Sequence, residues 1–256
     1  MATFAIGDIH ANLPALTDLL SKLRPEVSRR DAVVFLGDFV DRGSNAKGCI
    51  DAILEFEAQV DAEVIGLCGN HEDWMLRTMR DYRRHSWLLG MEPLETIRSY
   101  SPAAADELER AARSAGSLLY LGGCALPYEV FFDTMPASHR VFFENLRTHY
   151  QCEHGICAHA GIDPSLPIQV PLAHPRESLV WGVQGFPQHY AGREVVVYGH
   201  RNNAELDDAD WPHPAIAGNT YGIDTIAHGV LTAMRFPDLR LYQSGMYEKR
   251  PLDRYE

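Results

Sequence analysis

Basic residues are scarce in this sequence relative to acidic ones. The 256 residues include 23 Lys and Arg against 35 Asp and Glu, which gives a formal net charge of −12 at pH 7. Because proteins hold nucleic-acid phosphates mainly with Lys and Arg, this balance argues against a nucleic-acid partner. A groove that binds DNA or RNA is therefore not expected.

Paired cysteines are also lacking. The five cysteines are odd in number and include no Cys-x-x-Cys pair: Cys49, Cys68, Cys124, Cys152 and Cys157. This pattern indicates neither a disulfide framework nor a zinc knuckle. We expect reduced thiols that are mostly buried.

The sequence has no long apolar run. None approaches the roughly 20 residues that a membrane-spanning helix needs, and no basic segment leads into an apolar one as in a secretion signal. We therefore expect no membrane association and a cytoplasmic location. With 46% hydrophobic and 23% charged residues, the composition predicts a globular protein with a sizeable core, and we expect one domain over residues 1–256.

The most informative stretch that is present covers residues 33–43. A short β-rich apolar run stops at Gly37, and the charged residues Asp38, Asp41 and Arg42 follow within five positions. This pattern predicts a buried strand that opens into a turn with reactive side chains. Taken alone, it would more often mark a strand end with a solvated charge cluster.

Four other segments repeat this design of an apolar strand, a tight glycine turn and a side chain that can bind a metal. They are residues 4–10, 64–72, 156–161 and 195–200. A single short motif gives many false positives, but five in order at strand-to-turn junctions favour one shared site.

Strands alternate with helices in the first part of the chain. The patterns predict strands at residues 3–6, 31–36 and 64–67, with helices at 13–23, from about 44 to 56 and from about 72. Asn12 is suited to cap the first helix. This alternation implies βαβ units, whose functional side chains gather at the carboxyl ends of the strands.

The pattern becomes helical and aromatic over residues 74–150, where no further strand-turn motif occurs. We expect an inserted helical cap in this segment. Its arginines fit a solvated helix face, although a cap beside a phosphate site could use one of them: Arg77, Arg80, Arg83 and Arg84. Closing strands are expected near Ile223 and at 231–235 and 239–242, with Pro237 and Asp238 in a hairpin turn.

The candidate metal ligands offer oxygen and imidazole donors but no thiolate. They are Asp8, His10, Asp38, Asn70, His159 and His200. This donor set suits manganese, iron, zinc or nickel rather than a sulfur-bound structural ion. Six donors are too many for one tetrahedral ion, but two ions about 3.5 to 4 Å apart fit if Asp38 bridges them. Bound cations would also offset the negative charge of the chain beside a phosphorylated substrate.

The five motifs resemble those of the calcineurin-like metallophosphoesterases, specifically the serine/threonine phosphoprotein phosphatases and their bacterial relatives. The family pattern of Gly-Asp-x-His, Gly-Asp-x-Val-Asp-Arg-Gly, Gly-Asn-His-Glu, His-Ala-Gly and Gly-His is met in order by residues 7–10, 37–43, 69–72, 159–161 and 199–200. Similarity to bacterial members continues at residues 87–90, 99–100, 139–142, 223–225 and 231–233. The resemblance implies an α/β fold, a four-layer α/β/β/α sandwich of two mixed sheets with the helical cap inserted at about 74–150.

The resemblance also implies a pair of divalent ions, with Mn2+ favoured and Fe, Zn or Ni as alternatives. It divides the ligands between two ions that share Asp38: Asp8 and His10 on the first, and Asn70, His159 and His200 on the second. Two cations lower the pKa of a bridging water, so that a hydroxide is available as nucleophile near neutral pH.

Further roles follow for the residues beside these ligands. Arg42, with Asn70 and His71, would bind the substrate phosphate, and Arg42 would meet its oxygens with a planar guanidinium. His71 would protonate the leaving oxygen as general acid, and Asp41 would hold the His71 ring and favour its charged form. The structural alternatives are a salt bridge for Arg42 and a helix cap for His71.

The sequence departs from the family pattern after the last Gly-His, where Arg201 and Asn202 stand in place of the frequent Thr. A second phosphate-binding arginine is expected before that motif, but residues 179–183 contain none. Arg176, Arg193 and Arg201 stay open for this role. The remaining histidines are interpreted as surface or structural residues, with His228 the least secure: His85, His139, His149, His154, His174, His189, His213 and His228.

Three functions are compatible with these observations. The first is a metal-dependent phosphoesterase that hydrolyses phosphomonoesters, of proteins at Ser or Thr or of small molecules. The second is a hydrolase of dinucleoside polyphosphates such as diadenosine tetraphosphate, although such enzymes often carry Gln where this chain has His10. The third is a non-catalytic scaffold, which Arg42 and His71 disfavour because a binding module needs no general acid. Neither the native substrate nor the oligomeric state is indicated.

Overall fold

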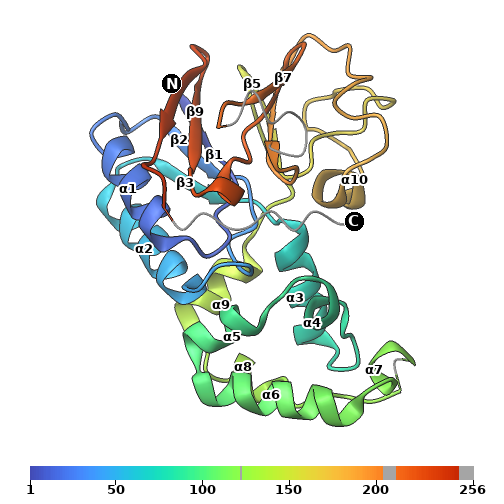
Figure 1. The fold of residues 1–256 in the computed structure, drawn as a ribbon. Helices are drawn as coiled ribbons and strands as arrows, with labels where there is room; N and C mark the ends of the chain where they lie inside the picture. The colour runs from blue at the N-terminus through green and yellow to red at the C-terminus, as the bar shows by residue number, and fades with distance from the viewer. Residues whose placement is uncertain (122, 204–211, 248–256) are drawn as a thin grey trace.

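Two five-stranded sheets lie at the centre of the computed structural model, which describes residues 1–121, 123–203 and 212–247 (Figure 1). The first sheet contains β1 (Thr3–Ile6), β2 (Ala32–Phe35), β3 (Glu63–Gly66), β9 (Thr232–Phe236) and β10 (Arg240–Gln243). Its strand order is β10-β9-β1-β2-β3. Strands β1, β2 and β3 are parallel, whereas β9 and β10 close the sheet as an antiparallel hairpin, as the sequence predicted.

Two helices connect the parallel strands of the first sheet and cover its outer face (Figure 1). They are α1 (Leu13–Leu23) and α2 (Ala46–Gln59). The Asn12 side chain accepts a hydrogen bond from the Ala15 N–H and caps α1, as predicted, and Asn45 caps α2 through the Gly48 N–H. These caps set the point at which each loop after a strand becomes a helix.

The second sheet is also mixed. It contains β4 (His149–Cys152), β5 (Gly155–Ala158), β6 (Val195–Tyr198), β7 (Ala215–Ala217) and β8 (Thr220–Gly222), in the order β4-β5-β6-β8-β7. Strands β5, β6 and β8 are parallel, and the edge strands β4 and β7 are antiparallel to their neighbours. The short helix α10 (Arg176–Trp181) and a loop cover its outer face with Leu179, Leu172 and Phe186.

The two sheets pack face to face through a separate apolar layer. Alternation along β2 divides its side chains, because Val34 faces the second sheet while Val33 and Phe35 face the helices. Val197 of β6 and Phe236 of β9 belong to the same inter-sheet layer. The predicted α/β fold with two mixed sheets is confirmed, although among the described residues the helical layer outside the second sheet is one short helix.

In the described chain, every secondary-structure element between β3 and β4 is a helix. They are α3 (Asn70–Arg80), α4 (Ser86–Gly90), α5 (Leu94–Tyr100), α6 (Pro102–Ala115), α7 (Leu118–Leu121), α8 (Glu129–Phe132) and α9 (Ala137–Glu144). Figure 1 shows this helical segment below the two sheets. An edge-on contact of 5.1 Å between the Phe39 and Phe142 ring centroids joins α9 to the loop after β2.

Several boundaries differ from the sequence-based expectations. Helix α3 begins at Asn70 rather than near Glu72, and β4 begins at His149, within the stretch expected to be helical. The strand expected near Ile223 is β8, which ends at Gly222, and β7 was not predicted. Both have three residues, which is too short for an alternation pattern to be distinctive. Among the described residues, no helix is both long and apolar enough to cross a membrane.

The inter-sheet layer predicts a large stability effect for Leu36→Ala. Leu36 has 0% exposure, so truncation leaves a cavity between the sheets and should lower the free energy of unfolding by about 2–5 kcal/mol. Leu121→Ala is the matched control, because Leu121 is 76% exposed and its loss should change stability by under about 0.5 kcal/mol. Urea unfolding of both variants checks this, and equal effects would contradict the packing described.

Candidate metal centre

The predicted ligands converge where the parallel strands of both sheets end. Asp8 and His10 follow β1, Asp38 follows β2, Asn70 follows β3, His159 follows β5 and His200 follows β6. Every one of these side chains is buried except that of His200, which is partly exposed. The structure thus brings residues from position 8 to position 200 into one cluster.

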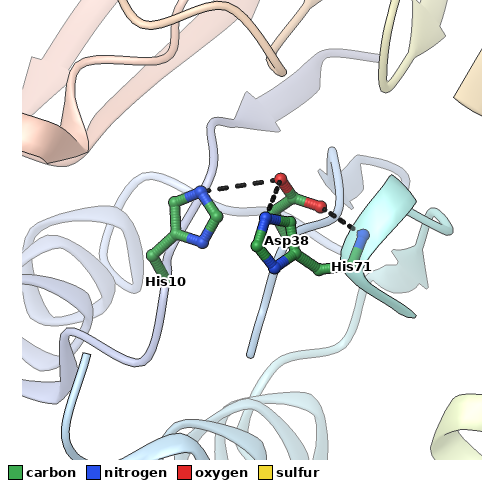
Figure 2. A group of neighbouring side chains, drawn as sticks. All are labelled: His10, Asp38 and His71. Carbon is green, nitrogen blue, oxygen red and sulfur yellow. Dashed lines mark hydrogen bonds and ion pairs between the residues drawn. The ribbon is translucent and has the colours of Figure 1, made fainter. Parts of the chain in front are cut away.

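Asp38 lies at the centre of this cluster. Its Oδ2 is 3.5 Å from His10 Nε2 and 3.9 Å from His71 Nε2, as Figure 2 shows. Its Oδ1 is 3.5 Å from His159 Nε2. Two groups with ligand-capable atoms within 4.8 Å of one another share Asp38, namely His10 with His71 and Asp8 with His159. This geometry suits a carboxylate that serves two neighbouring cation positions.

Asn70 joins the two histidines from the second sheet. Its Oδ1 is 2.9 Å from His159 Nε2 and 3.0 Å from His200 Nδ1. Asp8 reaches the same loop, since its Oδ2 accepts the His200 N–H at 2.8 Å. A Cβ on Gly199 would collide with Asp8 Oδ1, which explains why glycine precedes His200.

The hydrogen bonding of His159 leaves a ring nitrogen that could bind a cation. Its Nδ1 lies 3.0 Å from the Leu36 carbonyl oxygen, which can only accept, so Nδ1 carries the proton. Burial lowers the pKa of His159 and favours the neutral ring, whose Nε2 then presents a lone pair. That lone pair faces oxygens of Asn70 and Asp38. Acceptors that point at one another fit a metal ion between them.

The other two candidate imidazoles are also neutral. The Val40 carbonyl oxygen is 3.2 Å from His10 Nδ1, which leaves the Nε2 lone pair toward Asp38 and Arg42. Burial and Arg42 lower the pKa of His10 well below its ordinary value. Burial and the neighbouring His159 lower the pKa of His200 to about 3. Neutral imidazole is the form that binds metals.

The carboxylates fit the same interpretation. Asp8 is fully buried, and its Oδ1 has no hydrogen-bond partner in the described part of the chain. Burial, Asp224 and Asp38 raise the pKa of Asp8 well above its ordinary value. Burial acts in the same direction on Asp38, but His159, His71 and His10 more than offset it and lower the pKa of Asp38. A bound cation would relieve the cost of burying Asp8 ionised.

Backbone strain is concentrated in this cluster. Eight described non-glycine residues have positive φ, and five of them were predicted site residues: His10, Asp38, Asp41, Arg42 and His200. A φ of 49° at Asp38 costs of order 1–3 kcal/mol, so surrounding contacts must hold this turn in place.

Glu72 supplies those contacts and was not singled out from the sequence. Its carboxylate accepts the N–H groups of Asp38, Phe39 and Val40, and also that of Gly69 at the start of α3. Burial and Asp38 raise the pKa of Glu72 to about 8, whereas the four donors favour its ionised form. Its place three residues after Gly69, typical of a helix-capping Glu, was the available sequence signal.

His71 has a different partner from the other imidazoles. Its Nδ1 is 2.8 Å from Asp41 Oδ2, which also accepts the Trp87 indole N–H at 2.9 Å. Thr96 donates to Asp41 Oδ1 at 2.8 Å and accepts the Asp41 N–H at 2.7 Å. Burial opposes charge on His71, but Asp38 and Asp41 prevail and raise its pKa. Trp87 and Thr96 lie in the helical segment, and no local motif marks their contact with Asp41.

The candidate phosphate-binding arginines occupy different places. Arg42 is exposed, and its Nη1 donates to His10 Nε2 at 3.0 Å. Arg176 donates to Asp73 Oδ1 at 3.0 Å and to Cys68 Sγ at 3.2 Å, beside the turn that leads to Asn70. Arg193 precedes β6 and so lies at the opposite end of that strand from the cluster. Arg201 directly follows His200. Arg201 and Arg176 therefore both stay candidates for the second phosphate-binding arginine.

Two of the remaining histidines have structural contacts, in line with their interpretation. His85 lies between the Tyr128 hydroxyl, 3.2 Å from its Nδ1, and the Cys124 carbonyl, 3.0 Å from its Nε2. His139 contacts the Tyr100 hydroxyl at 2.8 Å and Asp51 at 2.9 Å. Both rings therefore connect helices within the helical segment or to α2.

Comparisons with known proteins agree with this architecture. The model of the family described as calcineurin-like phosphoesterase matches residues 1–229. A structure described provisionally as a diadenosine tetraphosphatase superposes with a TM-score of 0.57 at 18% identity, over 96% of this chain and 94% of that one. A cold-active protein-tyrosine phosphatase from a psychrophilic Shewanella species gives 0.56 at 14% identity, over 94% and 77%.

A third solved structure, a protein serine/threonine phosphatase from Saccharomyces cerevisiae, gives a TM-score of 0.50 at 16% identity, over 99% of this chain and 82% of that one. At such identities the three structures show a shared fold. A search of curated proteins found no match to this chain.

The shared position of Asp38 predicts that Asp38→Ala loses paired metal binding. Both three-residue groups contain this carboxylate, so its removal should leave fewer than the two ions per chain expected of a two-metal site. The measurement is metal content by mass spectrometry after chelation and reloading with Mn2+. Asp106→Ala, an exposed carboxylate on α6, is the control and should load like the native protein. Unchanged loading of Asp38→Ala would refute a bridging role.

Proposed function

This chain belongs to the calcineurin-like phosphoesterase family, whose members hydrolyse phosphoric esters, and we propose that it cleaves phosphomonoesters as a serine/threonine phosphoprotein phosphatase. The observation that carries the proposal is that Asp38 lies next to both the candidate metal ligands and His71. Neutral imidazoles with lone pairs surround its carboxylate, and His71, oriented by Asp41, approaches it at 3.9 Å. Metal ligands and a proton donor are therefore adjacent.

We assign the metal positions as the sequence suggested. Asp8 and His10 would hold one ion, Asn70, His159 and His200 the other, and Asp38 both. When bound, the two ions supply an activated water and neutralise part of the phosphate charge. Mn2+ is the proposed occupant, because oxygen and imidazole donors without thiolate suit it.

Arg42 would bind and orient the phosphate. Its side chain is exposed at the edge of the cluster, and its guanidinium already reaches His10 Nε2 at 3.0 Å. A planar guanidinium can donate two parallel hydrogen bonds to phosphate oxygens, which fixes the phosphorus relative to the ligands. Arg176 or Arg201 would supply a second cation from the opposite sheet.

His71 would donate the proton to the leaving oxygen. Asp41 takes the hydrogen bond from Nδ1, so the ring turns Nε2 toward Asp38 and His10. Nε2 is buried and has no hydrogen-bond partner among the described residues, which leaves it available to a substrate oxygen. Trp87 and Thr96 each donate a hydrogen bond to the Asp41 carboxylate, and the Asp41 N–H donates to the Thr96 hydroxyl, so the carboxylate that positions the ring is held in place.

The choice of phosphoprotein substrate rests on two supports. The five motifs follow the pattern of the serine/threonine phosphoprotein phosphatases, and His10 stands where dinucleoside polyphosphate hydrolases often carry Gln. The yeast serine/threonine phosphatase shares the fold along 99% of this chain. The second candidate, a dinucleoside polyphosphate hydrolase, is favoured by the fuller mutual coverage of the provisional diadenosine tetraphosphatase, 96% and 94%.

We expect His71→Ala to keep its metal ions and lose rate according to the leaving group. A general acid contributes about 10²–10⁴-fold when the leaving oxygen is basic, as in phosphoserine, and far less for p-nitrophenolate. Steady-state kcat on both substrates, with metal content measured in parallel, checks this. His154→Ala, a histidine outside the cluster, is the control. Equal losses on both substrates would exclude His71 as proton donor, and loss of one ion would make it a ligand.

A substrate panel separates the two candidate functions. With Mn2+, we expect release of phosphate from p-nitrophenyl phosphate and from phosphoserine and phosphothreonine peptides at higher kcat/KM than cleavage of diadenosine tetraphosphate. A phosphotyrosine peptide covers the activity named for the Shewanella neighbour. Preference for the dinucleotide, with release of nucleoside diphosphate, would establish the second candidate instead. Chelated protein serves as the blank.

A further inference from the structure

A cavity of about 310 Å³ lies between α3, the turn after it, α4 and α7. Figure 1 shows these helices together at one side of the helical segment. Its lining combines cations with aromatic and apolar side chains: Trp74, Arg77, Arg83, Arg84, Leu119 and Tyr120. None of these residues has a role in the metal centre. We call this cavity the arginine pocket.

Its positive charge is unusual in a chain with a formal net charge of −12. Arg77 pairs with Asp73 at 2.8 Å, but Asp73 also accepts hydrogen bonds from Arg176 and Trp181 and so is shared. Arg84 lies 3.6 Å from Asp81, a loose pair in which the Arg84 side chain is 58% exposed. Arg83 forms no ion pair with any described residue. The pocket therefore keeps positive charge for an anionic ligand.

The frame that carries these arginines is fixed. The Thr78 hydroxyl of α3 donates a hydrogen bond to the Arg84 carbonyl oxygen at 3.0 Å, which holds the turn against the helix. The next residue, His85, is held between Tyr128 and Cys124. Because the backbone is already positioned, a ligand would have to order only the side-chain ends.

Helix α3 also sets the distance between the pocket and the metal centre. Asn70 is its first residue and Arg77 follows seven residues later, which corresponds to about 10 Å along the axis. Trp74 lies between them and packs on Trp181 with ring centroids 4.7 Å apart. An extended peptide spans about 3.3–3.6 Å per residue. A phosphate bound beside Asn70 thus places the side chain about three residues away near Arg77, which lines the arginine pocket with Arg83 and Arg84.

We propose that the arginine pocket binds an acidic side chain of the substrate about three residues from the phosphorylated one, and so selects acidic phosphoproteins. The inference rests on the proposed phosphoprotein phosphatase function. Arg83 and Arg84 pair with the carboxylate, while Trp74, Leu119 and Tyr120 contact its methylene groups and the peptide.

The test compares phosphoserine peptides that differ only in Glu or Ala three residues before or after the phosphoserine. The native protein should give a kcat/KM about 3–10-fold higher for one Glu peptide at low salt, and the advantage should shrink as salt rises. The double variant Arg83→Glu with Arg84→Glu should lose or invert the preference. Arg110→Glu with Arg113→Glu, the same charge change on α6, is the matched control and should keep it.

All variants should hydrolyse p-nitrophenyl phosphate at the native rate, which shows that the metal centre is intact. Equal rates on Glu and Ala peptides with the native protein would overturn the pocket assignment, as would a preference that survives in the Arg83, Arg84 variant. Loss of the preference in the control variant as well would assign it to overall charge and also overturn the pocket. Hydrolysis of p-nitrophenyl phosphate with no peptide cleaved would instead refute the phosphoprotein function.

Discussion

The first turn of α3 is the constraint on which the rest of the site depends. Successive residues on a helix point about 100° apart, so four neighbours can face four different partners. Asn70 faces the histidines of the second sheet, His71 faces Asp41, Glu72 faces the turn after β2, and Asp73 faces α10. One turn thus supplies a proposed metal ligand, the proposed proton donor, the carboxylate that holds the turn after β2 and a contact to α10, and the Gly69 N–H bond to Glu72 fixes the start of that turn.

The energies involved show why the turn after β2 needs the hydrogen bonds to Glu72. The left-handed backbone of Asp38 costs of order 1–3 kcal/mol, and Asp41 and Arg42 are in the same region. Glu72 accepts three N–H groups of this turn, each contributing roughly 0.5–1.5 kcal/mol or more when the acceptor is charged. The sum is comparable to the strain at Asp38.

How much of the site the sequence predicts depends on how far apart in the sequence the contacting residues lie. The five strand-turn motifs are local patterns, and the parallel strands of one sheet bring their carboxyl ends together, so the convergence of Asp8, Asp38 and Asn70 was foreseeable. The addition of His159 and His200 from the second sheet was implied by the family resemblance. The contacts of Asp41 with Trp87 and Thr96 span 46 and 55 residues, and neither partner lies in one of the five strand-turn motifs. β7 was not recognised and β8 was placed only approximately, because three residues carry no clear period. β4 was also missed, because it is half-buried and follows directly on helices.

The proposed metal ligands and the groups that orient His71 come largely from different elements of the fold. All six proposed ligands lie at strand ends of the two sheets or at the start of α3, whereas the hydrogen bonds that hold Asp41 come from the helical segment. The proposed metal ligands and the orientation of the proposed acid therefore depend in part on different regions of the fold. A change in the packing of α4 or α5 can alter the orientation of His71 through Asp41 while Asp38 and the ligands around it stay in place. The helical segment thus helps to position the proposed acid.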